Sequence, residues 1–374
     1  MGLGTRIRQA VLGVDWILVA AVGLLLGFGL KVMDAATVSY GNYFTDRQMV
    51  FIAGATVLGI ALAALDITRL QGFAWVILGG LLGALAVVFV LGSTVKGAHS
   101  WISLGPFNLQ PSEMGKVAIT VVLAALAVER MADMGTVRTS LFLTGVAAAP
   151  AAVIFLQPDL GTALVYGAIL GAVLFLAGAP WTHFAAAGAA LVVAVLMILV
   201  VLPQVAGVQV LHGYQRERLT AFVQNDPNSG TAGYQLDQAK TAIGSGGALG
   251  KGPSGATQTL NRFLPEFHTD FIFAVTAEMY GFVGAAGVLL LYGVILWRIL
   301  RLTARAATQM EQLVAGGIGA MILFQVFVNI GMNVGIMPIT GIPLPFVSYG
   351  GSHTITNIAA IGILTSIHRR RAGL

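Results

Sequence analysis

The chain has 374 residues, of which 57% are hydrophobic and 9% are charged, and its mean hydropathy is +0.87. This composition excludes a soluble globular protein and indicates a polytopic membrane protein. The absence of cysteine excludes disulfides and thiolate metal sites. The formal charge of +5 does not require a nucleic-acid partner, because the basic residues lie mainly in short loops and at the C-terminus, where insertion topology explains them.

Apolar runs recur at about the 20 residues that a helix needs to cross a bilayer. The fold class is therefore all-α, with about ten transmembrane helices, and the 48 glycines favour close helix packing. Residues Met1–Asp15 continue into an apolar stretch without a small-residue cleavage site, which predicts a retained first helix. The expected spans are Trp16–Met33, Met49–Leu65, Phe73–Leu91, Ser112–Val128, Ser140–Phe155, Leu160–Leu176, Phe184–Val201, Phe271–Leu296, Leu313–Met332 and Ser352–Ile367.

The distribution of arginine predicts the topology. An even number of spans puts both termini on one side, and the positive-inside rule makes the arginine-rich side cytoplasmic. A polar loop of about residues 202–270, between the seventh and eighth helices, then lies on the outer side. We expect one integral membrane domain over residues 1–374, with short surface helices near Val201–Gly213 and Leu236–Ile243 in this loop. The arginines on the cytoplasmic side are Arg6, Arg8, Arg69, Arg130, Arg138, Arg298, Arg301, Arg305, Arg369, Arg370 and Arg371.

The glycine-rich segment Ile243–Gly252 has neither the spacing of a P-loop nor that of a dinucleotide fingerprint. Two interpretations stay open. The segment is either a flexible turn or a nest of backbone N–H groups that holds a phosphate beside Lys240 and Lys251.

Polar residues also gather where the fourth and sixth spans begin. Ser112 and Glu113 suit the first turn of a helix, so capping alone could account for both. Lys116 lies three residues after Glu113 on the same face, and a charged pair there must point into the bundle or into a wet cavity. Asp159 opens the sixth span, and helix capping is again the alternative.

The end of the long polar loop holds the densest group of acid, base and hydrogen-bonding side chains. Arg262, Glu266 and His268 precede Asp270, and Glu278 follows it by eight residues. Ordinary helix geometry would put Glu278 roughly 12 Å deeper than Asp270, where a carboxylate is a functional candidate. Although Asp270 could also simply begin a helix, its neighbours predict a catalytic carboxylate at the membrane–water boundary.

The last outer loop, Pro338–Ser352, contains three prolines, so it cannot be helical. It is nevertheless too apolar to lie free in water. We expect this loop, which includes Ser348, to re-enter the bundle and line the cavity; a rigid connector is the alternative.

Taken together, these segments resemble the SEDS family (shape, elongation, division, sporulation), the RodA and FtsW peptidoglycan polymerases. The ending Ser366–Arg369 is more similar to RodA than to FtsW. The similar segments are Lys96–Ala98, Gln110–Lys116, Gln157–Ala163, Tyr214–Arg216, Ala232–Tyr234, Ile243–Lys251, Phe263–Ala277 and Pro338–Ser352.

The resemblance implies a glycosyltransferase that polymerises lipid II at the outer face of the bacterial cytoplasmic membrane during cell elongation. Asp270, in a His-Thr-Asp-Phe motif, would take the proton from a GlcNAc 4-hydroxyl as it attacks MurNAc C1 with inversion. Lys116, Arg216 and Lys251 would stabilise the departing undecaprenyl pyrophosphate, and a divalent cation, Mg or Mn, could assist. The other implied substrate-binding residues are Lys96, Trp101, Gln110, Glu113, Asp159, Glu266, His268 and Ser348.

Two positions depart from the family pattern. Ser100 stands where an arginine usually precedes the tryptophan, and Met279 stands where a second acid usually follows Glu278. The implied partners are a class B penicillin-binding protein, other membrane proteins of the elongation complex and membrane lipids, with no nucleic acid.

Two other functions compete with this interpretation. A lipid flippase or transporter would also need buried charges, but near the bilayer midplane. A non-catalytic scaffold would have no need of charges at the tops of helices. Because the charges gather at one membrane surface, the sequence favours an enzyme.

Overall fold

The computed structural model describes residues 13–95, 98–105, 107–197 and 230–371, together with Gly213, Arg218 and Phe222. Within this part of the chain, ten long helices correspond to the ten expected spans. They are α2 (Trp16–Ala36), α3 (Tyr43–Ala63), α4 (Ala74–Leu91), α5 (Pro111–Glu129), α6 (Val137–Leu156), α7 (Leu160–Leu176), α8 (Trp181–Leu196), α12 (Ile272–Thr303), α13 (Gln309–Val334) and α14 (Gly351–Arg371).

Seven helices among the described residues are long and apolar enough to cross a membrane: α2, α3, α4, α5, α6, α12 and α13. Two more, α7 and α8, are apolar but shorter. The last helix, α14, has 21 residues but is more polar, because it buries Ser352, Thr356 and Asn357 among its neighbours. The all-α polytopic fold class is thus confirmed.

Short elements connect these helices. They include a three-stranded antiparallel sheet, order β1-β2-β3, which the sequence analysis did not predict. The sheet consists of β1 (Ser93–Val95), β2 (Ala98–Leu104) and β3 (Phe107–Leu109), and the remaining elements are α10 (Gly230–Gly246), α11 (Thr257–Leu260), η1 (Val38–Tyr40), η2 (Ile67–Phe73), η3 (Met131–Asp133) and η5 (Pro253–Gly255).

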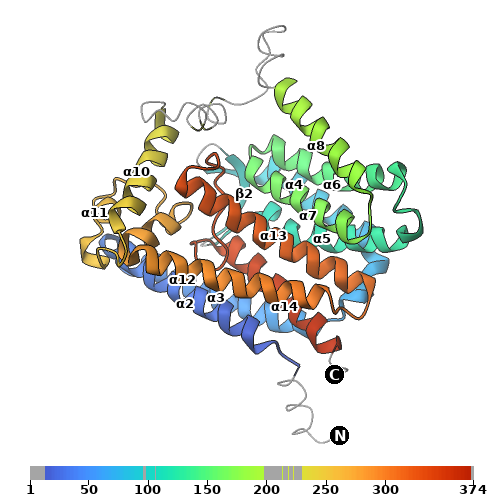
Figure 1. The fold of residues 1–374 in the computed structure, drawn as a ribbon, viewed down its shortest axis with the longest axis horizontal. Coiled ribbons are helices and arrows are strands. Elements are labelled where there is room, and N and C mark those ends of the chain that lie inside the picture. The colour runs from blue at the N-terminus through green and yellow to red at the C-terminus, as the bar shows by residue number, and fades with distance from the viewer. Residues whose placement is uncertain are drawn as a thin grey trace, which may run out of the picture.

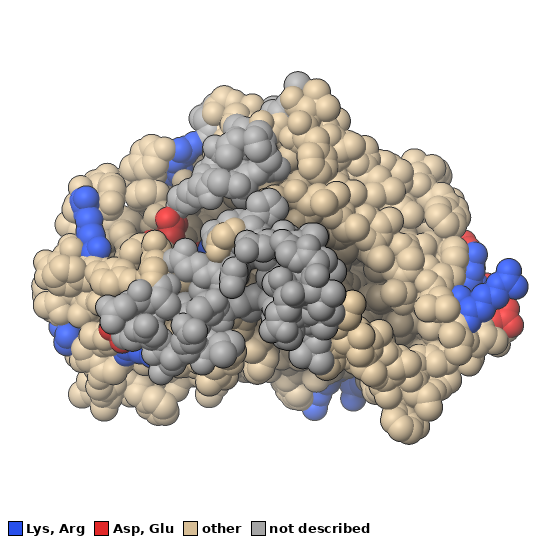
Figure 2. Space-filling model, turned by 90° about the horizontal axis from the view of Figure 1, so that it is seen from above, with Lys and Arg blue, Asp and Glu red and all other residues tan. Residues whose placement is uncertain are grey.

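Helices α2, α12 and α13 run roughly along the long axis of the molecule, α8 is oblique to them, and α10 and α11 lie at one end of the bundle (Figure 1). On the face in Figure 2, charged side chains gather mainly toward the two ends of the long axis. The surface helix expected at Leu236–Ile243 is part of α10, which packs on α12 and α13. The other expected surface helix, Val201–Gly213, lies outside the described residues apart from Gly213.

Helix α12 is not the single continuous span that we predicted. It breaks at Gly281, which has φ +65° and ψ −164°, a conformation that glycine adopts without steric cost. Beyond the break, Phe282 N donates to Gly247 O (2.9 Å) and Val283 N donates to Ala248 O (3.1 Å). The break is therefore closed by hydrogen bonds from the helix to the glycine-rich turn.

The same turn donates its own N–H groups to α12. Lys251 N donates to Glu278 O and Gly252 N to Met279 O, both at 2.9 Å. A side chain at Gly250 would overlap the Met279 carbonyl. The glycines thus allow two backbones to pack closely. The N–H groups of Lys251 and Gly252 already donate to α12, so the phosphate-nest interpretation is wrong for these two donors.

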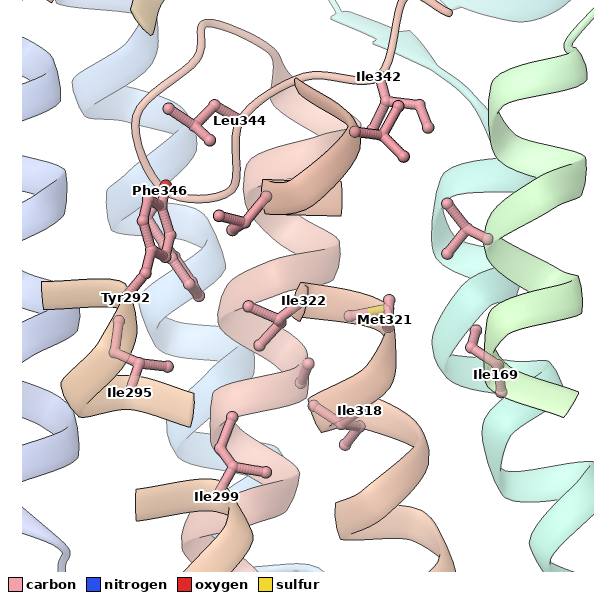
Figure 3. Packing of buried hydrophobic residues seen from close by; sticks show 14 of the residues in the cluster. Ile169, Tyr292, Ile295, Ile299, Ile318, Met321, Ile322, Ile342, Leu344 and Phe346 are labelled. Atoms are coloured by element: carbon pink, nitrogen blue, oxygen red, sulfur yellow. The ribbon is translucent and has the colours of Figure 1, made fainter. Parts of the chain in front are cut away.

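The proline-rich loop re-enters the bundle, as expected. Leu344 and Phe346 are buried, and Phe346 lies beside Tyr292 of α12 (Figure 3). The Tyr292 hydroxyl donates to Pro345 O. Burial of these side chains fixes the loop against α12 and α13, and so fixes the residues on either side of it.

Candidate active site

A cavity of about 360 Å³ lies between the start of α5, the start of α7, α14, strand β2 and the loops that precede α12 and α14. It brings together six residues that the sequence analysis selected from four separate segments. These are Trp101, Gln110, Glu113, Asp159, Glu266 and Asp270.

The backbone of Asp270 is held firmly. Asn329 Nδ2 (2.9 Å) and Asn333 Nδ2 (3.1 Å) both donate to Asp270 O. Asn333 Oδ1 in turn accepts from Ala274 N at 3.1 Å, which satisfies a donor in the first turn of α12. Two side chains of α13 thus fix where α12 begins and where the Asp270 side chain leaves the backbone.

The Asp270 carboxylate and the Arg218 guanidinium border the same point in the cavity. A Cβ built on Gly341 would lie 3.6 Å from Asp270 Oδ2 and 3.6 Å from Arg218 Nη1. Gly341 has φ +76°, which disfavours any other residue there. The loop therefore leaves room for an acid and a cation to face one small space.

Ser348 does not line this cavity. Its hydroxyl donates to Thr269 O (2.6 Å) and accepts from Leu344 N (2.8 Å). The hydroxyl therefore joins the re-entrant loop to the residue before Asp270, and the role of Ser348 as a substrate ligand stays a prediction.

His268 also lies away from the cavity wall. Its ring packs on Phe44 (centroids 4.6 Å apart) and on Tyr349 (5.8 Å). Its carbonyl accepts from Tyr349 N at 2.9 Å. Tyr349 itself lines the cavity, and burial raises the pKa of its hydroxyl, so it stays a neutral hydrogen-bonding group.

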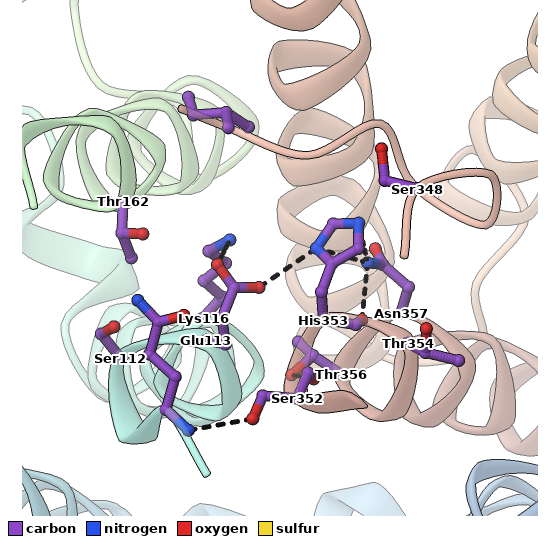
Figure 4. Close-up of polar contacts among 12 residues, drawn as sticks. Ser112, Glu113, Lys116, Thr162, Ser348, Ser352, His353, Thr354, Thr356 and Asn357 are labelled. Atoms are coloured by element: carbon purple, nitrogen blue, oxygen red, sulfur yellow. Dashed lines mark hydrogen bonds and ion pairs between the residues drawn. The ribbon is translucent and has the colours of Figure 1, made fainter. Parts of the chain in front are cut away.

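Glu113 and Lys116 form the expected buried pair, with Lys116 Nζ 2.5 Å from Glu113 Oε1. The second oxygen, Oε2, lies 3.2 Å from Nδ1 of His353 on α14 (Figure 4). Glu113 and His353 line the cavity, whereas Lys116 is completely buried behind Glu113. The Lys116 ammonium therefore neutralises the Glu113 carboxylate and does not itself face a ligand in the cavity.

Asp159 both caps a helix and lines the cavity. Its Oδ1 accepts from Thr162 N (2.9 Å) at the start of α7, so the capping alternative is correct. Its Oδ2 accepts from Gln110 Nε2 (3.0 Å) and Ser112 Oγ (3.4 Å). Burial raises the pKa of the Asp159 carboxyl.

Strand β2 presents Ser100 and Trp101 to the cavity. Ser100 Oγ donates to Gln157 O at 2.9 Å. Ser100, which stands where the family usually has an arginine, thus joins the sheet to Gln157, the residue before Pro158.

Lys251 is not among the residues that line the cavity. Its Nζ lies 4.0 Å from Glu278 Oε1. Glu278 is buried beside α11, where it accepts from Gln258 N (2.8 Å), Thr259 N (3.1 Å) and Thr259 Oγ1 (2.7 Å). The break at Gly281 follows Glu278, so this acid lies in the short first part of α12. Lys96 and Arg216 lie outside the described residues.

The sequence analysis missed several residues of the site. His353 and Asn357 lie one helical turn apart in a span that is unusually rich in polar residues, and this polarity was the available signal. Asn329 and Asn333 show the same four-residue spacing in α13. No feature of the sequence around Arg218, apart from its charge, indicated that it belongs to the site.

The described residues contain no group of three or more His, Asp or Glu side chains arranged to hold a metal ion. Asp159, Glu266 and Asp270 share one cavity without forming such a group. Since one or two carboxylates together with substrate phosphates suffice to hold Mg²⁺, Asp159, Glu266 and Asp270 are the described residues that would hold such an ion at the cavity.

The chain is similar to known proteins over nearly its whole length. Residues 9–373 match the FtsW/RodA/SpoVE family of cell cycle proteins. Peptidoglycan glycosyltransferase MrdB of Escherichia coli K12 is 36% identical, over 95% of this chain and 93% of its own. A probable peptidoglycan glycosyltransferase FtsW of Thioalkalivibrio sulfidiphilus is 38% identical, over 98% of this chain and 92% of its own.

Solved structures agree with these relatives. A chain of a peptidoglycan synthase complex, described as coordinating polymerization and crosslinking, has a TM-score of 0.82 and 32% identity, covering 96% of this chain and 98% of that one. The rod shape determining protein RodA of Thermus thermophilus has a TM-score of 0.70 and 29% identity, covering 96% and 97%. The family match and the two relatives together establish that the chain belongs to the FtsW/RodA/SpoVE family, the SEDS proteins.

Proposed function

We propose that this chain is a peptidoglycan glycosyltransferase that polymerises lipid II, with Asp270 as the general base. One observation carries the proposal: a carboxylate whose backbone is fixed by Asn329 and Asn333 borders a cavity at the end of the bundle where α10 and α11 lie. The names of the similar proteins support the same activity.

The proposed reaction needs one base and one region of positive charge. Asp270 takes the proton of the acceptor 4-hydroxyl while that oxygen forms a bond to C1 of the donor sugar. The bond between C1 and the diphosphate oxygen breaks with inversion, and undecaprenyl pyrophosphate leaves with both electrons. A diphosphate is already a good leaving group, so no acid partner for Asp270 is required.

Arg218 is the cation that we now assign to the departing diphosphate. It lines the cavity, and its guanidinium borders the same point as the Asp270 carboxylate. Planar guanidinium groups bind phosphate oxygens in pairs. The earlier candidates Lys116 and Lys251 do not line the cavity, so they are less suited to bind a diphosphate there.

A second, apolar pocket of about 240 Å³ suits the lipid part of such a substrate. It lies between α3, α4, α5 and α14, and it shares α5 and α14 with the polar cavity. An isoprenoid chain could therefore lie along the bundle while its diphosphate enters the cavity. The pocket is lined by Leu58, Leu62, Leu70, Ile77, Met114, Val117, Ala118, Val121, Ile355, Thr356, Ala359 and Ile363.

We further propose that the chain acts in the bacterial cytoplasmic membrane, with cytoplasmic termini, beside a class B penicillin-binding protein of the elongation complex. The arginine-rich loops support the orientation, and the similar chain in a peptidoglycan synthase complex supports the crosslinking partner. Depletion from its native cells should give round cells. Filamentous cells would instead assign the chain to division.

The decisive experiment measures polymer formation from lipid II by the purified chain together with a partner whose transpeptidase site is disabled. Asp270→Asn should lower the rate by about a thousandfold, because a positioned base contributes roughly 10²–10⁴. Asp46→Asn, an exposed acid in the first turn of α3, is the matched control and should keep full activity. Asp270→Asn with normal polymer formation would remove Asp270 from the mechanism.

The same preparation separates the two other functions. A flippase would move lipid II across vesicle membranes and form no polymer. A scaffold would bind the partner and do neither. Either result from folded, partner-bound protein would contradict the glycosyltransferase proposal.

A further inference from the structure

His353 is a titratable side chain in the cavity wall that the reaction above does not use. It lies in the first turn of α14, only 3% of it is exposed, and its ring points toward Glu113 (Figure 4). A buried imidazole beside a substrate cavity can bind a ligand or exchange a proton.

One ring nitrogen is already engaged. Glu113 Oε2 lies 3.2 Å from His353 Nδ1, and Lys116 Nζ lies 2.5 Å from the other carboxylate oxygen. An ionised Glu113 accepts from both groups, so His353 carries its proton on Nδ1. The second nitrogen, Nε2, is then the one that can gain a proton.

Asn357 supports the ring from one side. Its Nδ2 lies at nearly equal distances from the two ring nitrogens, 3.3 Å from Nδ1 and 3.2 Å from Nε2. Equal distances mean that the amide lies over the face of the ring, so Nε2 is not used by an in-plane hydrogen bond. Asn357 Oδ1 is buried without a hydrogen-bond partner among the described residues.

The local charge decides when His353 can be protonated. Lys116 and Glu113 cancel each other, so a second proton on His353 leaves two cations beside the one carboxylate of Glu113. This excess of positive charge is costly unless a second anion lies beside it. The other charged groups that line the cavity are Asp159 at the start of α7, Glu266 and Asp270 before α12, and Arg218.

We propose that His353 is a substrate-positioning residue that takes up a proton together with the diphosphate of the lipid-linked sugar and donates Nε2–H to a phosphate oxygen. This inference rests on the proposed function. The proton comes from water, Glu113 holds Nδ1–H, and no covalent bond to the diphosphate forms or breaks at His353. By linkage, an anion that binds with a proton binds more tightly as the pH falls.

The experiment uses inorganic pyrophosphate as the probe and the full-length chain in detergent. Calorimetric titration near pH 7.5, in two buffers of different ionisation enthalpy, counts the protons taken up on binding. The native chain should take up about one proton. His353→Gln should take up none and bind roughly tenfold more weakly, since a hydrogen bond to a charged group is lost.

His183→Gln is the matched control. His183 pairs with Ser140 through Nδ1 at 2.8 Å, and it does not line the cavity. This variant should keep both the proton count and the affinity of the native chain. Asn357→Asp provides a second test if His353→Gln is unstable: a carboxylate over the ring protonates His353 before the anion arrives, so the proton count should fall.

Proton uptake that persists in both His353→Gln and Asn357→Asp would overturn the inference, as would a native chain that binds no pyrophosphate. Polymer formation from lipid II, measured separately, tests the proposed function. A native chain that binds pyrophosphate with one proton but forms no polymer would reject the glycosyltransferase and retain His353 as an anion-binding residue.

Discussion

The part of α12 before Gly281 separates two acidic residues, Asp270 just before the helix and Glu278 near the break. The Glu278 carboxylate is fully buried and accepts three hydrogen bonds from the start of α11. The Asp270 carboxylate borders a cavity, while its backbone carbonyl takes the structural hydrogen bonds from Asn329 and Asn333.

The difference shows that one short helical segment has a carboxylate bonded to α11 near one end and a carboxylate that borders the cavity at the other. A carboxylate that satisfies several buried donors is costly to move or protonate. The support of Asp270 comes through its main chain, while its carboxylate borders the cavity. In the proposed reaction, this backbone support holds the Asp270 carboxylate at the cavity where it would take the proton.

Removing the break that follows Glu278 should have the largest effect on stability. A Cβ at position 281 would lie 2.6 Å from the Ala248 carbonyl. The new residue would also have to keep the backbone φ of +65°. Gly281→Ala should therefore lower the free energy of unfolding by about 3 kcal/mol or more. Thermal unfolding in detergent measures it, and Gly287→Ala, with open space around it, is the control. Equal midpoints for the two variants would contradict the close approach.

Glu278→Gln should have the next largest effect. The amide can accept from one of the donors in α11 but meets another with its own N–H groups, at a cost of about 2 kcal/mol. Polymerisation per folded molecule should stay near the native rate. Glu129→Gln, at the exposed end of α5, is the control. A loss of activity at unchanged stability would instead make Glu278 part of the chemistry.

Lys251→Ala should have the smallest effect. Its ammonium is partly exposed and 4.0 Å from Glu278, so its removal should cost less than about 1 kcal/mol. The apparent KM for lipid II should change by less than about twofold. A large rise in KM would contradict this prediction and would indicate that Lys251 binds the substrate.

The sequence predicted the helical fold well. All ten expected spans have a corresponding helix in the described part of the chain. A bilayer requires long apolar helical segments, and such segments can be recognised from the local sequence alone. It did not predict the sheet of β1, β2 and β3, whose strands are short and close to a membrane helix. It also did not predict the break at Gly281, since glycine is common throughout this chain.

The sequence by itself determined the class of protein, the order of the long helices and the acidic residues worth testing, because hydropathy and charge are local properties of the chain. Only the tertiary structure decided which charges share the cavity. His353 reaches Glu113 across 240 residues, and Arg218 and Asp270 meet at Gly341. Lys251 and Ser348 are occupied elsewhere. Whether a polar side chain serves a neighbour or a ligand depends on which partners packing brings within hydrogen-bond distance, and no local pattern contains that information.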